Sequence, residues 1–284
     1  MIDLHTHTTA SDGRCAPAEL VSRAAAAGVT VLSVTDHDTV AGYQAAAAAA
    51  VAAGVELVPG IEITAVVEGA DVHVLGYFID VHSPRLLAFL ADQRRRRIDR
   101  VRQIIDRLAS HAIVLDPDAI LQPGLDDPGI AIGRPWIARA LVAGGHVADS
   151  NQAFARWLGR GRPAFVPRLG AMPEEVVARI HEAGGLASLA HPGLIGHDEW
   201  LTGFAADGLD ALEAYHSNHD PTATAHYLSE AARLGLVVTG GSDYHADETH
   251  GADGPGSVSL PREAYAKLVR LKADTTTSDR PRSA

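Results

Sequence analysis

Polar clusters follow apolar runs at six places along this chain, and the runs alternate with helix-like stretches. The sequence reads HTH after MIDL, TDHD after VLSV, GIEI within a third run, AHPG after GLASL, YHSNH after LDALEA and GGSDYH after GLVVT. Alternation of β-rich runs with helical segments predicts a parallel sheet covered by helices. Because the carboxyl ends of parallel barrel strands meet at one rim, these clusters are expected to converge in space.

Histidine and carboxylate residues dominate the clusters. A lone histidine is often a hydrogen-bonded core residue, and a lone aspartate can cap a helix, so no single residue decides the matter. Together, imidazoles and carboxylates are the ligands of Zn, Mn or Fe, and the lack of cysteine argues against a structural zinc site. His73 stands apart because it comes early in its run, VHVLGYFI. The residues expected to meet at this rim are His5, His7, His37, His191, Asp243 and His245.

The alternation is interrupted in the middle of the chain. Residues 85–170 are expected to form a helical insertion, in which a long helix over Pro84 to Leu108 carries the run RRRR on its solvated face. Proline and glycine punctuate DPDAILQPGLDDPG, and two shorter helical pieces follow. The α/β units on either side, 1–84 and 171–272, add up to about seven strand-helix units, one short of an eightfold barrel. Residues 273–284 are polar and expected to form a disordered tail.

Composition excludes several classes of protein. The chain has 284 residues, 46% of them hydrophobic, which is enough for a substantial core. A formal net charge of -11 with only two lysines argues against a duplex DNA surface, although a local arginine pocket can hold one phosphate. The single cysteine, Cys15, excludes an internal disulfide and is expected to be inert. The sequence has no apolar segment long enough to span a membrane and no signal-peptide pattern, so a cytoplasmic protein is expected. The composition does not indicate the number of subunits.

The motifs HTHTTASDG, TDHDT, PGIEI, the His73 strand, LAHPG and GGSDYH resemble, in this order, those of the PHP (polymerase and histidinol phosphatase) superfamily. The resemblance is to its stand-alone metal-dependent phosphoesterases, and it implies an α/β fold, a distorted (β/α)7 TIM-like barrel with a helical insertion. It also implies two or three divalent transition metals (Mn, Fe or Zn) and a metal-bound water as the nucleophile. His5, His7 and Asp243 would hold one metal, and Glu62 would bridge to a second. His73 and His191 would complete the second site, while Asp12, His37 and His245 would hold a third.

The insertion contains a further resemblance. IGRPWIARAL is similar to the family's GRPHIARAL stretch, and the match implies that Arg134 contacts the substrate phosphate. Trp136 replaces the family's histidine, and either stacks on a base or packs against the core. YHSNHDP places His216 and His219 near the same mouth. His219 is a candidate substrate contact, and a turn leading into a helix at Pro221 is the alternative.

The resemblance implies a hydrolase of phosphomonoesters on nucleotides, either nucleoside 3',5'-bisphosphates or the 5' ends of short RNA. Histidinol phosphate is the alternative substrate. A PHP module that has lost its chemistry and only binds a partner is an alternative of another class, and the complete set of nine ligands weighs against it. The expected partner is therefore a small phosphorylated molecule.

Overall fold

A computed structural model describes residues 1–247 and 251–277 of the chain. Seven strands form one sheet in which spatial order follows sequence order. Their bounds are β1 Ile2–Asp3, β2 Val31–Val34, β3 Glu56–Val67, β4 Ala70–Tyr77, β5 Leu186–Leu189, β6 Ala211–His216 and β7 Val237–Gly241. The Leu4 amide donates to the Gly240 carbonyl at 3.3 Å, and the Asp243 amide donates to the His5 carbonyl at 2.8 Å. These bonds join the two outer strands, so the sheet nearly closes into a barrel.

The hairpin of β3 and β4 departs from the expected run of parallel strands. β1, β2 and β3 are parallel, and so are β5, β6 and β7, but β4 is antiparallel to both of its neighbours. Only the turn at Glu68 and Gly69 separates β3 from β4, which leaves no room for a crossover helix. The expectation of an all-parallel sheet was therefore wrong for β4. The seven strands and the barrel-like α/β fold are as predicted.

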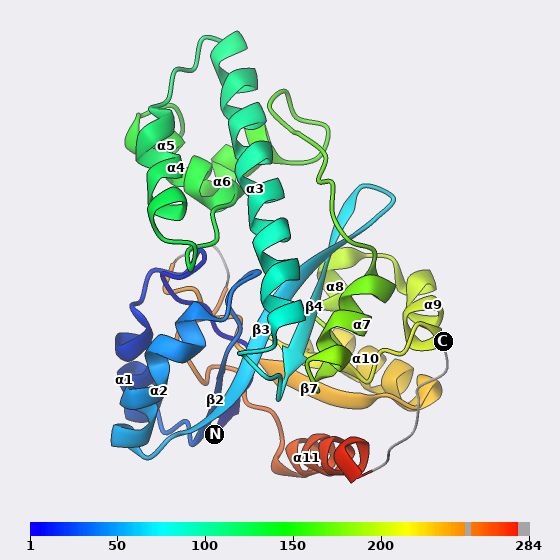
Figure 1. Cartoon of the computed structure of the whole chain (residues 1–284). Helices are drawn as coiled ribbons and strands as arrows, with labels where there is room; N and C mark the ends of the chain where they lie inside the picture. The colour runs from blue at the N-terminus through cyan, green and yellow to red at the C-terminus, as the bar shows by residue number, and fades with distance from the viewer. Residues whose placement is uncertain (248–250, 278–284) are drawn as a thin grey trace.

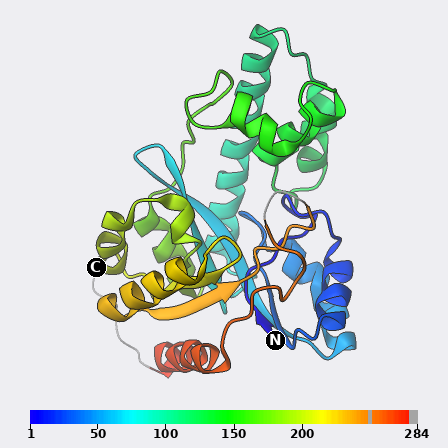
Figure 2. The ribbon, with the colours of Figure 1, turned by 180° about the vertical axis from the view of Figure 1, so that it is seen from behind.

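Helices cover the outside of the sheet and build a second layer above it (Figure 1). Those packed around the barrel are α1 Pro17–Ala26, α2 Ala41–Ala53, α7 Pro173–Glu182, α8 Pro192–Ile195, α9 Leu201–Ala206, α10 Pro221–Leu234 and α11 Arg262–Thr277, with a 3-10 turn at Asp198–Trp200. Those above it are α3 Pro84–Ser110, α4 Pro117–Asp126, α5 Arg134–Ala143 and α6 Ser150–Ala153, the last continued by a π-helix at Phe154–Leu158. Seen from behind, α11 lies below the barrel, away from the upper helices (Figure 2).

The upper helices share a hydrophobic core of their own. Ile104, Leu108, Ile137 and Leu141 are all buried in it, whereas Leu90 near the start of α3 packs into the core of the barrel. α3 therefore crosses from one core to the other. The stretch read as punctuation by proline and glycine contains α4, whose residues Ile120 and Leu121 pack against α3 and α5 despite Pro123 inside the helix. Burial of those side chains outweighs the hydrogen bond that the proline removes.

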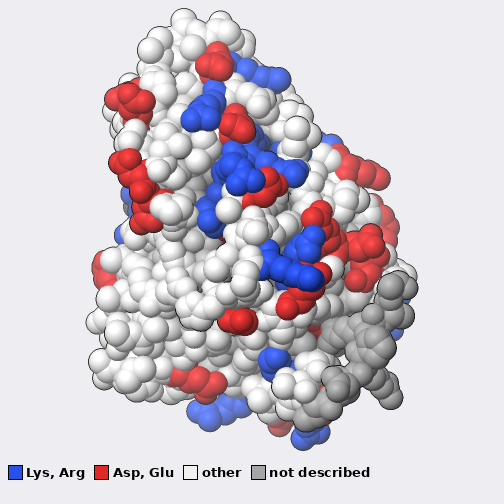
Figure 3. Space-filling model, in the orientation of Figure 1, with Lys and Arg blue, Asp and Glu red and all other residues white. Residues whose placement is uncertain are grey.

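The arginine run of α3 does not lie wholly in solvent, contrary to expectation. Arg95 and Arg96 are exposed and pair with Asp92, and arginines gather over α3 among acidic residues in Figure 3. Arg97 and Arg100 are instead buried, at 6% and 7% exposure. Positions 93, 97 and 100 are four and three residues apart, so the helical period of 3.6 residues turns them to one inward face, where Asp38 and Asp71 meet the two arginines.

The last helix also differs from expectation. α11 continues to Thr277, so the disordered tail expected from residue 273 does not begin there. The Thr275 and Thr276 hydroxyls each donate to the Lys272 carbonyl at 2.9 Å. These bonds give hydrogen-bond partners to a carbonyl near the end of the helix. Residues 278–284 of the expected tail lie outside the described residues. Across the described ranges, no helix is both long and apolar enough to cross a membrane.

Candidate metal centre

The nine candidate ligands meet at one rim of the barrel. His5 and His7 follow β1, His37 follows β2, His191 follows β5, and Asp243 and His245 follow β7. With His216 they fall into four overlapping groups whose potential ligand atoms all lie within 4.8 Å of one another. The groups are His7, Asp12, His37 and His245; His5, His216 and Asp243; His5, Glu62 and His191; and His37, Glu62 and His73.

The antiparallel hairpin explains how His73 reaches the rim. His73 lies opposite Thr64 in the register of β3 and β4, two residues past Glu62. Because β4 runs against its neighbours, its beginning lies at the rim where the parallel strands end. A histidine early in this run is therefore equivalent to a histidine late in the others.

Glu62 lies at the centre of the cluster, and its two carboxylate oxygens face different sets of imidazoles. Oε1 lies 2.8 Å from His73 Nδ1 and 3.2 Å from His191 Nε2. Oε2 lies 3.5 Å from His5 Nε2, 3.2 Å from His7 Nε2 and 3.0 Å from His37 Nδ1. The side chain is 1% exposed. This is the arrangement that a carboxylate bridging two cations requires.

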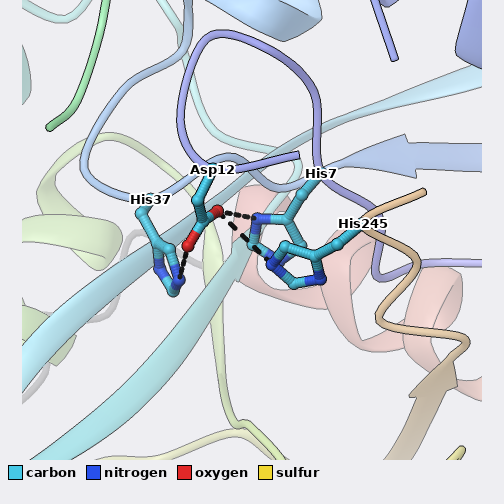
Figure 4. Close-up of side chains that lie close together, drawn as sticks. All are labelled: His7, Asp12, His37 and His245. Carbon is cyan, nitrogen blue, oxygen red and sulfur yellow. Dashed lines mark ion pairs between the residues drawn. The ribbon is translucent and has the colours of Figure 1, made fainter. Parts of the chain in front are cut away.

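Asp243 and Asp12 collect the remaining imidazoles. Asp243 Oδ1 lies 3.3 Å from His5 Nε2 and 3.2 Å from His7 Nε2. Asp12 approaches His245 Nε2 at 3.3 Å and His37 Nε2 at 3.5 Å, with His7 Nδ1 at 3.7 Å (Figure 4). His37 thus touches both the Asp12 group and the Glu62 group through its two nitrogens, so the groups share ligands rather than forming three separate sets.

The potential ligand atoms are better placed to bind cations than to form hydrogen bonds with one another. His5 Nε2, His7 Nε2, His37 Nδ1 and His73 Nδ1 are buried and make no hydrogen bond among the described residues. These same atoms are the ones that face Glu62 within 3.5 Å, so they are close to the carboxylate without being aligned for an N–H to donate. A cation between the nitrogen and oxygen atoms satisfies both kinds of donor.

Electrostatics points to the same need for positive charge. Burial raises the pKa of Glu62, but the surrounding imidazoles, His37 foremost, hold it well below its ordinary value. Neighbouring histidines likewise hold the pKa values of Asp12 and Asp243 well below the ordinary value of an aspartate. Burial lowers the pKa of His7, yet the nearby carboxylates of Asp243 and Glu62 raise it to about 10. The carboxylates therefore stay ionised, and either protons on imidazoles or bound cations must balance them.

Glu213, which sequence analysis did not single out, orients two of the ligands. It is fully buried, accepts a hydrogen bond from His5 Nδ1 at 3.0 Å and accepts another from the His191 amide at 2.7 Å. With Nδ1 donating, His5 turns the lone pair of Nε2 toward Glu62 and Asp243. A glutamate in the largely apolar stretch LDALEAY was the signal in the sequence.

Backbone strain marks two of the ligand positions. His191 has φ 27° and Asp243 has φ 54°, in the left-handed region that non-glycine residues seldom adopt. Each lies two residues past the end of its strand, β5 for His191 and β7 for Asp243. Such conformations cost free energy and persist where surrounding hydrogen bonds enforce them. Here the His191 amide donates to the Glu213 carboxylate, and the Asp243 amide donates to the His5 carbonyl.

Arginine side chains line a cavity of about 170 Å³ next to the ligands. Arg134 donates to Asp71 Oδ2 at 2.9 Å, and its guanidinium lies 5.5 Å from the Phe154 ring centre. Arg168 approaches Asp71 Oδ1 at 3.3 Å, and Arg97 pairs with Asp38. The cavity is lined by Asp12, His37, Asp71, His73, Arg97, Arg134, Pro135, Phe154 and Arg168.

Besides Arg134, the sequence carried a signal for only one of these neighbours. Asp71 precedes His73 by two residues in β4, so the period of a strand places both on one face. Arg97 was hidden in a run that reads as solvated. Arg168 lies in the irregular segment before α7, where no periodicity predicts burial. Burial, with repulsion from Arg97, lowers the pKa of Arg168 to about 9.

Trp136, His216 and His219 lie near the mouth of the barrel. The sequence left the roles of Trp136 and His216 open and made His219 a candidate substrate contact. Trp136 Nε1 donates to the Ser11 carbonyl at 2.9 Å, and the Arg139 guanidinium lies 4.7 Å from the ring centre, so Trp136 ties the insertion to the ligand loop. His216 Nδ1 accepts from the Asn218 amide, which leaves Nε2 to donate to Asp243 Oδ2 at 3.3 Å. His216 is thus placed to orient Asp243.

His219 does not suit the substrate contact expected of it. Nδ1 donates to the Ala214 carbonyl at 3.0 Å, and Nε2 accepts from the Gly193 amide at 3.2 Å. Both ring nitrogens are therefore occupied by backbone groups, and the side chain braces the loops after β5 and β6. The alternative of a turn leading into α10 describes it better.

Comparison with known proteins agrees with this site. Residues 3–116 match the model of the PHP domain. A 3',5'-nucleoside bisphosphate phosphatase of Chromobacterium violaceum is 34% identical over 283 residues, which cover 95% of this chain and 98% of the relative. The 5'-3' exoribonuclease Rnm of Escherichia coli is 36% identical over 250 residues, covering 86% of this chain and 84% of the relative.

A solved structure shares the whole architecture. A protein of Bifidobacterium adolescentis, assigned as a metal-dependent phosphoesterase, superimposes with a TM-score of 0.85 at 33% identity, over 94% of this chain and 95% of that one. The shared barrel, the converging ligands and relatives matched along nearly their full length leave one assignment: this chain belongs to the PHP domain family.

Proposed function

We propose that the chain is a metal-dependent phosphoesterase that hydrolyses phosphomonoesters of nucleotides. One observation carries the proposal. A buried cluster of imidazoles and carboxylates, centred on Glu62, opens into a cavity of about 170 Å³ whose other wall is arginine. Cation ligands on one side and guanidinium groups on the other suit a phosphate group held between them.

The resident cofactors are two or three divalent transition metals, Mn, Fe or Zn. Glu62 would bridge two of them, with His5, His7 and Asp243 on one side and His73 and His191 on the other. Asp12, His37 and His245 would hold the third. When bound, such ions activate a water for attack and neutralise charge on phosphate oxygens. The buried nitrogen atoms that face Glu62 without a hydrogen bond support this set of ligands.

The arginines are the phosphate-binding groups of this chain. Arg97, Arg100, Arg134 and Arg168 surround only two carboxylates, those of Asp38 and Asp71. The excess of positive charge attracts an anion, and a planar guanidinium can donate two parallel hydrogen bonds to a phosphate. Arg134 is the most exposed of the four, with 24% of its side chain accessible, and it is the one that we assign to the substrate.

The helical insertion, residues 85–170, acts as the substrate lid. It brings Arg134 at the first turn of α5 over the ligands, and α3 anchors it to the barrel through Arg97 and Asp38. The Trp136 bond to Ser11 adds a second anchor beside Asp12. A lid tied down at two points holds its arginine in place before substrate arrives.

Substrate class follows from the relatives. Those matched over most of their length are named for nucleoside bisphosphates and for the 5' ends of RNA, so a nucleotide phosphate is the favoured substrate. Histidinol phosphate is the alternative. An inactive binding module is disfavoured because all nine ligand positions carry residues able to bind metal.

A substrate panel tests the proposal. The purified protein, supplemented with Mn²⁺, is assayed on adenosine 3',5'-bisphosphate, histidinol phosphate and a 5'-phosphorylated dinucleotide. Release of phosphate or mononucleotide from the two nucleotide substrates, and far less from histidinol phosphate, is the expected result. Preference for histidinol phosphate would replace the substrate assignment. No hydrolysis of any of them by a metal-loaded protein would favour the binding module.

A further inference from the structure

One segment of the helical insertion is strongly basic. Residues 150–173 contain four arginines and no aspartate, glutamate or lysine, in a chain whose formal net charge is -11. The segment covers the π-helix and the irregular stretch that leads from it to α7. Its arginines are Arg156, Arg160, Arg162 and Arg168. Positive charge is therefore concentrated here, although the chain as a whole is acidic.

Arg168 places one end of this basic segment at the metal rim. It lines the arginine-lined cavity beside the ligands, where its Nε lies 3.3 Å from Asp71 Oδ1. The backbone of the segment is held against the hairpin of β3 and β4, because the Val66 amide donates to the Ala171 carbonyl at 2.8 Å. Figure 1 shows the segment passing beside this hairpin on its way to α7. The basic segment therefore leads outward from the rim along the hairpin.

Arg160 lies a short distance further along the hairpin. Its Nη2 donates to the Glu68 carbonyl at 3.2 Å, in the turn that joins the two strands. Asp71, which contacts Arg168, follows Glu68 by three residues, so a rise of about 3.3 Å per strand residue keeps the two contacts within roughly 10 Å of each other. Arg160 is exposed, whereas Arg168 is half-buried. The two arginines are therefore neighbours, one in the cavity and the other on the surface beside it.

The three outer arginines form no ion pair with a carboxylate in the described part of the chain. Arg156, Arg160 and Arg162 are exposed, and the groups that contact the first two are a neutral glutamine amide and a backbone carbonyl. By contrast, Arg102 is exposed on α3 but pairs with Asp99 at 3.1 Å. A row of guanidinium groups without compensating carboxylates attracts a partner with several negative charges.

A single-stranded nucleic acid fits this row better than a single small anion does. Its phosphates recur along the chain, so each guanidinium group can neutralise one of them and release the counterions that it held. Guanidinium planes also stack on unpaired bases. Leu169 and Met172, with 79% and 57% of their surface exposed, add apolar surface at the inner end of the row. Because that end opens into the cavity at the metal rim, the partner is a strand whose end enters the cavity.

We propose that Arg156, Arg160 and Arg162 form a phosphate track, which binds a short RNA beyond the nucleotide that occupies the metal centre. The track rests on the proposed function, because it assumes that the 5' end of the RNA lies at the metal centre. It runs along the insertion on the hairpin side of the rim, outside the arginine-lined cavity. An RNA of several nucleotides should therefore bind more tightly than a dinucleotide, which offers fewer phosphates to the track.

Removing the three positive charges tests the track. The track variant carries Arg156→Gln, Arg160→Gln and Arg162→Gln. The control variant removes the same charge from exposed positions on α10 and α11, away from the insertion, through Arg233→Gln, Arg262→Gln and Arg270→Gln. Fluorescence anisotropy measures the Kd of each Mn²⁺-loaded protein for 5'-phosphorylated oligoadenylates of two and eight nucleotides at several salt concentrations. The first linkage of each RNA is a phosphorothioate, which slows hydrolysis during the measurement.

The parent and the control variant should bind the octanucleotide more tightly than the dinucleotide. The track variant should bind the octanucleotide about tenfold or more weakly than the parent does, while its Kd for the dinucleotide stays within about twofold of the parental value. The slope of log Kd against log salt should fall by about two, because each phosphate contact on a single strand contributes roughly 0.7. An equal loss in the track and control variants, or an equal loss for both RNA lengths, overturns the track.

Hydrolysis assays separate the track from the proposed function. The three arginines do not line the cavity at the ligands, so the track variant should hydrolyse adenosine 3',5'-bisphosphate with the parental kcat/KM, and circular dichroism checks its fold. Length-dependent binding that is lost only in the track variant supports the track even where no protein hydrolyses the bisphosphate, in which case the proposed function alone fails. Equal RNA binding by all three proteins contradicts the track even where hydrolysis is observed.

Discussion

Glu213 decides at the scale of one residue which nitrogen of His5 faces the metal centre. Glu213→Gln keeps the volume but weakens the bond to His5 Nδ1 and removes a buried charge. Metal affinity is expected to fall by about 10-fold to 100-fold, as is typical when the partner of a metal-binding histidine is lost. The check is metal content after dialysis against a weak chelator. Glu199→Gln is the matched control, because Glu199 also pairs with a histidine, His197 at 2.7 Å, but on the surface. Equal metal retention by both variants would contradict the role of Glu213.

Arg134 is the residue at which a catalytic role and a purely structural role differ most. Arg134→Ala is expected to lower kcat/KM on adenosine 3',5'-bisphosphate by about 100-fold to 1,000-fold, as loss of one preorganised donor does. Arg134→Lys keeps the charge but not the planar fork of the guanidinium, so its kcat/KM should lie between that of the parent and that of Arg134→Ala. Metal content should stay the same in both variants, which distinguishes this loss from damage to the ligands. Parental rates in both variants would rule out the contact with phosphate.

The candidate ligands could be predicted from sequence because each sits beside an apolar run, where a polar residue has few other reasons to be. Residues that orient them were harder to find. Glu213 is marked only by its charge within a largely apolar strand, and Arg168 lies in an irregular segment. His219 was misjudged because the bonds that occupy its ring come from the loop after β5 and the end of β6, which no local pattern connects.

At the scale of elements, α3 holds the insertion to the barrel through a buried ion pair. Arg97 donates to Asp38 and, at 3.0 Å, to the Thr64 hydroxyl. Arg97→Met leaves the Asp38 carboxylate buried without its main partner, so the free energy of unfolding should fall by about 3–5 kcal/mol. Urea unfolding measures it, with Arg95→Met on the outward face of α3 as the control.

A double variant separates loss of the ion pair from loss of packing. Asp38→Asn combined with Arg97→Met removes both charges, and it keeps a residue that tolerates φ 52° at position 38. Stability should recover part of the loss, because no unpaired charge remains. A double variant less stable than Arg97→Met alone would contradict this account of the pair.

Elements were predicted where their periodicity is strong and missed where packing overrides local signals. The strands and the long helix were visible, whereas α4 was concealed by its prolines and the hairpin of β3 and β4 by its two-residue turn. The hairpin matters for function, because it carries His73 and Asp71 to the rim from the opposite direction.

At the scale of the whole molecule, function comes from two layers that meet at one rim. The barrel supplies the imidazoles and carboxylates, and the insertion supplies arginines, so under the proposed function cations and phosphate would be held by different parts of the chain. Sequence analysis found both parts, but not the cavity of about 230 Å³ between them, because its walls come from Arg14, from α5 and α6, and from Asp247, which lie far apart along the chain.

The central claim is that the cluster around Glu62 is a metal centre that drives phosphoester hydrolysis. The most direct test measures metal by mass spectrometry in protein purified without chelators, together with hydrolysis of adenosine 3',5'-bisphosphate, for the parent and for Glu62→Gln. The parent should hold two or three transition metals and be active, while Glu62→Gln should fold, lose metal and lose turnover. Less than one metal in the parent with no activity restored by Mn²⁺, or near-parental turnover in a folded Glu62→Gln, would contradict the account.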